Sequence, residues 1–211
     1  MPPSPSTVFV VDDNASFLTG LVQWLRASGF MARGFSSAAE FLAQRPPEGA
    51  GCVLADLQMP GMSGMELQDA LAKTANPLPI VFLTGQGDIP ASVTAMRLGA
   101  EDFLTKRAPK EDLLAAVKRA LERDRRERAA RIRHRELSAL FAGLTPRERE
   151  VLTHVLRGQL NKQIAADLGI DERSVKRHRT GLMGKLHVQS VAELVHLANE
   201  VQAAHPSLRG R

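Results

Sequence analysis

The stretch Gly51-Cys-Val-Leu-Ala-Asp56-Leu-Gln-Met-Pro-Gly61 is an apolar run that ends on a carboxylate and then turns. A short apolar run bounded by glycines and followed by Met-Pro-Gly is typical of a buried strand. Such a strand places Asp56 at the end of a parallel sheet, where ligands bind. A second apolar run, Val8–Val11, stops at Asp12 and Asp13. Three acids at one edge repel one another, and the usual remedies are a bound cation or raised pKa values. The simpler interpretation is a hard cation with oxygen ligands, Mg²⁺.

Residues 7–121 alternate short apolar runs with longer helical patterns. Five successive βα units predict an α/β fold with a doubly wound parallel sheet. The predicted strands are Val8–Val11, Met31–Phe35, Gly51–Asp56, Ile80–Leu83 and Asp102–Thr105.

The ends of these strands carry groups that suit phosphoryl transfer. An aspartate that attacks a phosphoryl group needs a divalent cation, a fixed ammonium and a small hydroxyl donor. We predict that Asp12 and Asp13 bind the cation, that Asp56 is the nucleophile, and that Thr84 and Lys106 supply the hydroxyl and the ammonium.

Residues 122–143 form a charged segment with seven arginines and four acids. We predict a helical linker that extends the helix beginning near Pro109. The apolar positions Leu121, Ile132 and Leu140 are too sparse to indicate a coiled coil. Both a solvated single helix and a dimerising helix remain open.

Residues 144–204 predict a small all-α domain of four helices. Thr145 is expected to cap the first, with Pro146 at its first position. A short helix at Asn161–Leu168, a glycine-containing turn and a basic helix from Glu172 follow, which is the helix-turn-helix arrangement.

The basic helix has an apolar back and a cationic front. Val175, Leu182 and Leu186 share one face at about 100° per residue. A helix of this kind fits the major groove of DNA. On its outer side we expect Arg173, Arg177, Thr180 and Gly184, with Lys176 on the flank.

Individual roles follow from residue chemistry. Arg177 is expected to bind guanine bidentately, and Lys176 to contact a base or a phosphate. The predicted phosphate contacts are Lys162, Ser174 and Lys185.

The net charge of +5 is unevenly distributed. Residues 1–121 carry 10 Lys and Arg against 12 Asp and Glu, residues 122–143 carry 7 against 4, and residues 144–211 carry 11 against 7. This asymmetry suggests an acidic module joined to one that binds a polyanion. The single cysteine, Cys52, excludes an internal disulfide and favours a reducing compartment. Without a signal peptide or an apolar run of about 18 residues, we expect a cytoplasmic protein with no membrane partner.

Residues 7–121 resemble a response-regulator receiver domain. The resemblance rests on Val11-Asp-Asp-Asn14, Asp56-Leu-Gln-Met-Pro-Gly61, Thr84-Gly85 and Lys106. The whole chain resembles the FixJ/NarL class of two-component regulators, whose output domain is a LuxR-type helix-turn-helix. Here the matching stretches are Leu144–Leu152, Asn161–Ala165 and Val175–His178.

The resemblance implies a phosphorelay that controls transcription. A sensor histidine kinase would transfer phosphate to Asp56. Mg²⁺ would be held by Asp13, Asp56 and the backbone carbonyl of Gln58, and by Asp12 partly through water. Thr84 and Phe103 match the switch positions, although a strand aromatic such as Phe103 is also a common core residue.

The resemblance also implies partners. Phosphorylation would promote a homodimer through a surface around residues 89–98 and 102–105. The dimer would bind double-stranded DNA. RNA polymerase is a further candidate partner.

One residue departs from the family pattern. The family usually has a proline after the lysine, in a cis bond, whereas Lys106 is followed by Arg107. A non-proline cis bond costs about 2.5–4 kcal/mol. Either the strain is retained, or the bond is trans and the loop is rearranged.

We therefore predict a response regulator and transcription factor that is not an enzyme. Two alternatives remain open. One is a DNA-binding regulator with a silent receiver that ignores phosphate. The other is an aspartyl-phosphate phosphatase, which is disfavoured because no second acid lies two residues after Asp56.

Overall fold

The computed structural model describes residues 6–47, 49–85 and 89–203. By internal contacts the chain divides into two compact units, residues 1–128 and 129–211. The division falls inside the predicted linker, residues 122–143. The predicted domain boundaries themselves stay predictions.

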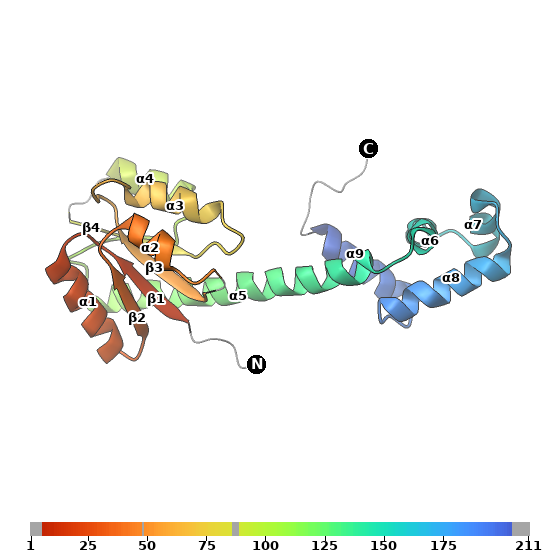
Figure 1. Cartoon of the computed structure of the whole chain (residues 1–211), viewed down its shortest axis with the longest axis horizontal. Coiled ribbons are helices and arrows are strands. Elements are labelled where there is room, and N and C mark those ends of the chain that lie inside the picture. Colours follow the sequence, from red (N-terminus) through yellow and green to blue (C-terminus); the bar gives the residue numbers. More distant parts are fainter. Residues whose placement is uncertain (1–5, 48, 86–88, 204–211) are drawn as a thin grey trace. The chain divides into compact units, whose positions relative to one another are not determined.

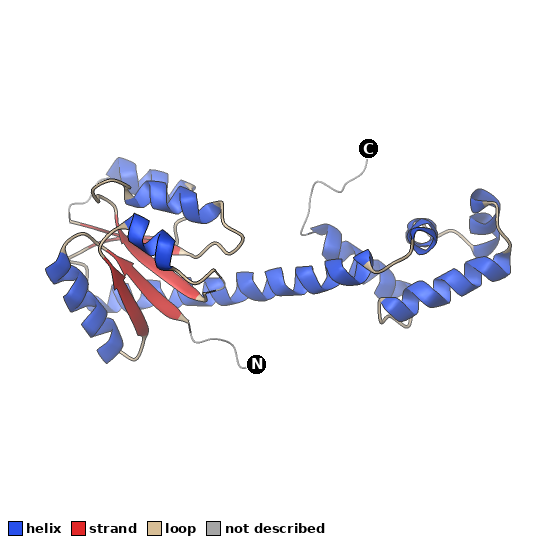
Figure 2. Ribbon diagram, viewed as in Figure 1, coloured by secondary structure: helices blue, strands red, loops and turns tan. Residues whose placement is uncertain are grey.

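The first unit is built on a parallel sheet of five strands (Figures 1 and 2). The order across the sheet is β2-β1-β3-β4-β5. The strands are β1 (Thr7–Val11), β2 (Met31–Phe35), β3 (Gly51–Asp56), β4 (Ile80–Thr84) and β5 (Asp102–Thr105). The helices that follow them are α1 (Ala15–Ala27), α2 (Ala38–Gln44), α3 (Gly64–Ala72), α4 (Ile89–Arg97) and α5 (Lys110–Ala142). The predicted doubly wound α/β fold is confirmed.

Two apolar clusters cover the two faces of this sheet. One contains Phe41 of α2, Leu67 of α3 and Ala95 of α4. The other contains Leu25 of α1 and Val117 of α5. Every residue of β3 is buried, which explains why its sequence is apolar up to Asp56 instead of alternating. Polar groups at the carboxyl end of the sheet therefore lie at or directly after the last residues of these strands, as Asp56 does at the end of β3.

Helix α5 is continuous for 33 residues, from Lys110 to Ala142. The predicted helical extension of the last receiver helix is thus confirmed. Its first part packs Ala116, Val117 and Ala120 on the sheet, and Leu137 belongs to the apolar core of the second unit.

Asp124 of α5 is buried, with 1% of its surface exposed. Its Oδ2 accepts a hydrogen bond of 2.9 Å from the backbone amide of Gly51, the first residue of β3. Gly51 has a φ of +150°, and a Cβ there would lie 1.8 Å from the carbonyl oxygen of Thr7, so only glycine fits. Asp124 therefore packs within the first unit, although it lies in the predicted linker, residues 122–143. The charge pattern of that segment does not reveal the buried amide that the carboxylate meets.

Residues 129–203, the described part of the second unit, hold four further helices around one apolar core. They are α6 (Pro146–Leu156), α7 (Asn161–Leu168), α8 (Glu172–Lys185) and α9 (Val191–Ala203). Thr145 caps α6 and Pro146 is its first residue, as predicted. Asp171 caps α8 by accepting a hydrogen bond from the Ser174 amide. The predicted helix-turn-helix order of helices is confirmed.

The Gly51–Asp124 contact leads to a prediction about stability. Asp124→Ala is expected to lower the free energy of unfolding of the first unit by about 1–3 kcal/mol, because a buried amide loses its acceptor. Asp124→Asn retains an acceptor oxygen and is expected to cost less. Urea unfolding followed by fluorescence of Trp24, the chain's single tryptophan, measures this.

The matched control is Glu122→Ala, because Glu122 is exposed on the same helix. Its effect should stay within about 0.5 kcal/mol. Equal effects of Asp124→Ala and Glu122→Ala would show that the buried contact contributes nothing.

Candidate functional site

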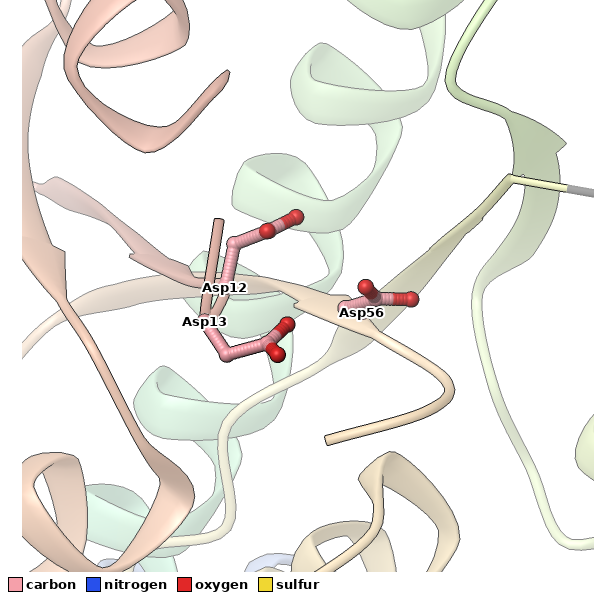
Figure 3. Close-up of side chains that lie close together, drawn as sticks. All are labelled: Asp12, Asp13 and Asp56. Atoms are coloured by element: carbon pink, nitrogen blue, oxygen red, sulfur yellow. The ribbon is translucent and has the colours of Figure 1, made fainter. Parts of the chain in front are cut away.

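Three acidic side chains converge at the carboxyl end of the sheet (Figure 3). Asp12 and Asp13 directly follow β1, and Asp56 ends β3. The strands β1 and β3 are parallel neighbours, with Val11 beside Ala55. One possible ligand atom from each acid lies within 4.8 Å of those of the others. The structure therefore brings the predicted acidic cluster together.

Lys106 lies in the loop after β5 and supplies positive charge to this cluster. Its Nζ is 2.6 Å from Oδ2 of Asp12 and 2.7 Å from Oδ2 of Asp56. Partial burial lowers the pKa of Lys106, but the hydrogen bonds to the two carboxylates outweigh it, and the pKa lies above its usual value. Lys106 is thus a charged ammonium at neutral pH, held against both acids.

Asp12 has an unfavourable environment for a carboxylate. Burial raises its pKa, and the Lys106 ammonium and the Asn14 amide offset only part of this, while the Asp56 charge adds to it. A hard cation favours oxygen ligands such as these carboxylates and would relieve their mutual repulsion. The donor set of Asp12, Asp13 and Asp56 fits a divalent cation of this kind.

Thr84 and Gln58 flank Asp56. Thr84 is buried at the end of β4, and its carbonyl accepts a 2.7 Å hydrogen bond from the Lys106 amide. The Gln58 amide is 3.3 Å from Oδ1 of Asp56. Their predicted roles, as hydroxyl donor and as a carbonyl ligand of the metal, stay predictions.

Phe103 is a half-buried residue of β5. Its ring lies 6.2 Å from that of Phe82 and packs against the apolar cluster under α2, α3 and α4. This position satisfies the packing expectation for a strand aromatic. The predicted switch role of Phe103 stays a prediction.

The Lys106–Arg107 peptide bond is trans, because the described part of the chain contains no cis bond. This settles the alternative that the sequence leaves open. A trans bond avoids the cost of about 2.5–4 kcal/mol of a non-proline cis bond.

In the second unit, α8 presents the predicted cationic front. Val175, Leu182 and Leu186 are buried in the core. The residues of the predicted outer face are exposed, as is Lys162 near the start of α7. These outer residues are Arg173, Arg177, Thr180 and Gly184, with Lys176 on the flank.

Two predicted phosphate contacts already have protein partners. The Ser174 hydroxyl donates to Oδ2 of Asp171 over 2.7 Å. The Lys185 ammonium is 2.7 Å from Oε2 of Glu148. Sequence position alone shows neither contact. Binding of DNA phosphates by Ser174 or Lys185 stays a prediction, but both side chains also have a structural role.

Glu148 links α6 to α8. It is 6% exposed and accepts hydrogen bonds from the Lys185 ammonium and the Thr145 amide. A Cβ on Gly181 of α8 would lie 2.8 Å from its Oε1, so the helices meet closely here. The hydrogen bond from Lys185 lowers the pKa of Glu148 most, and the hydrogen bond from the Thr145 amide lowers it further.

Two family models match this chain. Residues 8–118 match the response regulator receiver domain, and residues 142–198 match the bacterial regulatory proteins of the luxR family. The chain belongs to the response regulators. Both matches cover the functional residues described above, the acidic edge in one and α7 and α8 in the other.

Relatives of similar length support this assignment. Nodulation protein W of Bradyrhizobium diazoefficiens is 41% identical, over 90% of this chain and 84% of its own. The transcriptional regulatory protein FixJ of Azorhizobium caulinodans is 38% identical, over 93% of each chain. The solved structure of the response regulator StyR is 47% identical, with a TM-score of 0.85, and the match covers 93% of this chain and all of that one.

The predicted two-component class is therefore confirmed. This response regulator combines a receiver with a LuxR-type helix-turn-helix, and its family consists of transcription regulators and not of conventional enzymes. Membership implies a histidine kinase partner and DNA as the target. Within the described ranges of the chain, no helix is both long and apolar enough to cross a membrane.

One contact of the response regulator's acidic edge is absent from the sequence prediction. The ring of Phe17 on α1 lies 4.7 Å from the Lys106 ammonium, measured to the ring centroid. The helical spacing of Phe17 marks it only as a core residue. No local signal pairs it with a lysine 89 positions further along the chain.

Glu148 gives a prediction about pH. A carboxyl whose folded pKa is lowered contributes stability above its ordinary pKa of 4.5, and this contribution is lost as the pH falls through the folded value. Glu148→Ala is expected to destabilise the second unit by about 1–2 kcal/mol at pH 7. The difference from wild type should narrow in acid below the ordinary pKa. Amide hydrogen exchange in α6 and α8 measures it.

The control is Glu150→Ala. Glu150 is a neighbouring acid whose ion pair with Arg147 is largely exposed. Exposed pairs of this kind contribute less than about 1 kcal/mol. A Glu148→Ala effect that stays constant from pH 7 into acid would contradict an electrostatic origin.

Proposed function

We propose that Asp56 is the phosphoacceptor of this response regulator and that phosphorylation promotes a DNA-binding dimer. The observation that supports the proposal most is the convergence of Asp12, Asp13, Asp56 and Lys106 at one end of the sheet. An aspartate that attacks a phosphoryl group needs a divalent cation and a fixed ammonium, and these acids and this lysine suit both needs.

The phosphoryl group would come from a phosphohistidine of the kinase. A carboxylate oxygen of Asp56 forms the new P–O bond as the P–N bond breaks, and the electron pair of that bond returns to the imidazole nitrogen. Lys106, 2.7 Å from Asp56, is placed to pair with a phosphoryl oxygen. Thr84, at the end of β4, would turn its side chain and donate its hydroxyl to another phosphoryl oxygen. Phe103 would then fill the space that Thr84 leaves.

Mg²⁺ is the cofactor that we propose for the acidic edge. Asp13, Asp56 and the backbone carbonyl of Gln58 would hold it, with Asp12 contributing partly through water. When bound, the cation offsets charge on the phosphoryl oxygens. Burial raises the pKa of Asp12. A cation bound nearby would oppose this effect and favour the ionised carboxylate.

The output that we propose is a dimer on DNA. Paired half-sites convert weak binding by one unit into tight binding by two, without new base contacts. Exposed apolar side chains on α4, Val93 and Met96, support a dimer surface around α4 and β5. Contact with RNA polymerase stays a prediction.

Sedimentation velocity with Mg²⁺, with and without beryllofluoride as a phosphoryl mimic, tests the receiver. Wild type is expected to shift towards a dimer. Asp56→Ala should not shift, and Asp13→Asn should need at least about tenfold more Mg²⁺ because it loses a charged ligand. If wild type stays unchanged while the Mg²⁺-dependent labelling of Asp56 also fails, the receiver is silent.

The DNA side rests on α8. Arg177→Ala is expected to weaken binding by about 1–3 kcal/mol, roughly tenfold or more, for a duplex that wild type selects from a random library. The loss should be smaller for unselected duplexes, because a base contact carries the specificity. Fluorescence anisotropy at several salt concentrations measures both.

Two other cations serve as comparisons. Lys162→Ala should weaken binding to all duplexes and reduce the slope of log affinity against log salt by about 1. Lys118→Ala removes an exposed cation from α5 in the first unit and should have no such effect. If Arg177→Ala behaves like Lys118→Ala, α8 is not the recognition helix.

A further inference from the structure

The ammonium of Lys106 contacts an aromatic ring as well as two acids. Asp12 and Asp56 lie 2.6 Å and 2.7 Å from its Nζ, and the centroid of the Phe17 ring lies 4.7 Å away. Phe17 is the third residue of α1, which directly follows the acidic turn after β1. A cation within about 6 Å of a ring centroid is attracted by the ring's quadrupole. Each of the three contacts therefore favours the same position of the ammonium.

The Lys106 side chain can adopt other conformations. Its side chain has four rotatable bonds, and 18% of its surface is exposed. Phe17 and Lys106 both line a groove of about 530 Å³ between α1 and the start of α5. An ammonium that turned into this groove would gain water and leave Asp56. The cation–π contact with Phe17 disfavours that movement, because the ammonium makes this contact while it lies beside the acids.

The Lys106 amide donates to the Thr84 carbonyl, but no proline restricts the backbone directly after the lysine. Arg107 follows Lys106 through a trans bond, and the first proline comes only at Pro109. A proline would fix φ directly after the lysine. Arg107 does not, and it is exposed. In this chain, contacts made by the side chain therefore carry more of the task of holding the ammonium.

We propose that Phe17 is a positioning residue for phosphoryl transfer at Asp56. Its cation–π contact keeps the Lys106 ammonium next to the carboxylate oxygen at which the phosphoryl group arrives. This inference rests on the proposed function of Asp56. In this role Phe17 acts through Lys106 and not by contact with the phosphoryl group.

The ordinary explanation is that Phe17 only packs. It is partly buried against the apolar cluster that contains Leu21 and Leu25. The two explanations, packing and positioning, predict different effects when other side chains replace the ring. Leucine retains apolar volume but has no aromatic face, whereas tyrosine and tryptophan retain one.

The experiment measures the affinity of the full chain for beryllofluoride with saturating Mg²⁺ and no kinase, by fluorine-19 NMR. Phe17→Leu is expected to weaken binding by about two- to fivefold, the range of a partly exposed cation–π contact. Phe17→Tyr and Phe17→Trp should bind as wild type does. In a Lys106→Met background, Phe17→Leu should have no further effect, because the group through which it acts is absent.

Trp24→Leu is the matched control. Trp24 lies in the same groove on the same helix, but its ring contacts Lys110, at 5.7 Å, and not Lys106. It should leave beryllofluoride affinity unchanged. An equal loss in Trp24→Leu and Phe17→Leu would show that disturbance of the groove, and not the contact with Lys106, causes the effect, and would overturn the proposal.

A second measurement reports the contact itself. The Cε protons of Lys106 should resonate upfield in wild type, because the ring current of Phe17 shields them, and this shift should vanish in Phe17→Leu. If wild type binds beryllofluoride and Phe17→Leu binds it equally well, the positioning role alone is overturned. Wild type that binds no beryllofluoride overturns the proposed function of Asp56 and this inference with it, even where the upfield shift is present.

Discussion

The ammonium of Lys106 is the counter-charge on which the acidic end of the receiver sheet depends. Three carboxylates meet there, and two of them lie within 2.7 Å of its Nζ. Without a positive charge nearby, like charges so close together repel one another and weaken the fold. The order of the strands brings a positive charge to these acids. Because β1, β3 and β4 are adjacent and β5 follows, the loop after β5 returns a lysine to the acids that the other strands deliver.

The strand β3 connects this site to the helix that leaves the unit. Its last residue is Asp56, and the amide of its first residue, Gly51, donates to the buried carboxylate of Asp124 on α5. All six residues of β3 are buried, so the strand has little freedom to move independently of the sheet. The positions of the candidate phosphoacceptor and of this part of α5 are thus both set by one short strand. Mutations at either end should be interpreted with the other end in mind.

In the helix-turn-helix unit, one buried acid binds a base that the sequence alone would assign to DNA. The carboxylate of Glu148 is used inside, where it caps α6 and binds Lys185. Arg173, Lys176 and Arg177 remain exposed on α8. The positive surface that DNA would meet is therefore smaller than the sequence count of Lys and Arg suggests. What is left lies on one face, since the opposite face packs in the core.

Local pattern determined much of this protein. The alternation of apolar runs and helical periods indicated five βα units, and the capping residue Thr145 marked a helix start. Asp12, Asp13 and Asp56 lay at or directly after strand ends. These signals depend on residues close together in the chain. Only the tertiary structure decided that Asp124 is buried, that Lys185 pairs with Glu148 and that Phe17 covers Lys106. Such contacts join residues far apart in sequence, 73 positions for Gly51 and Asp124, and burial and pairing at that separation depend on how the elements pack.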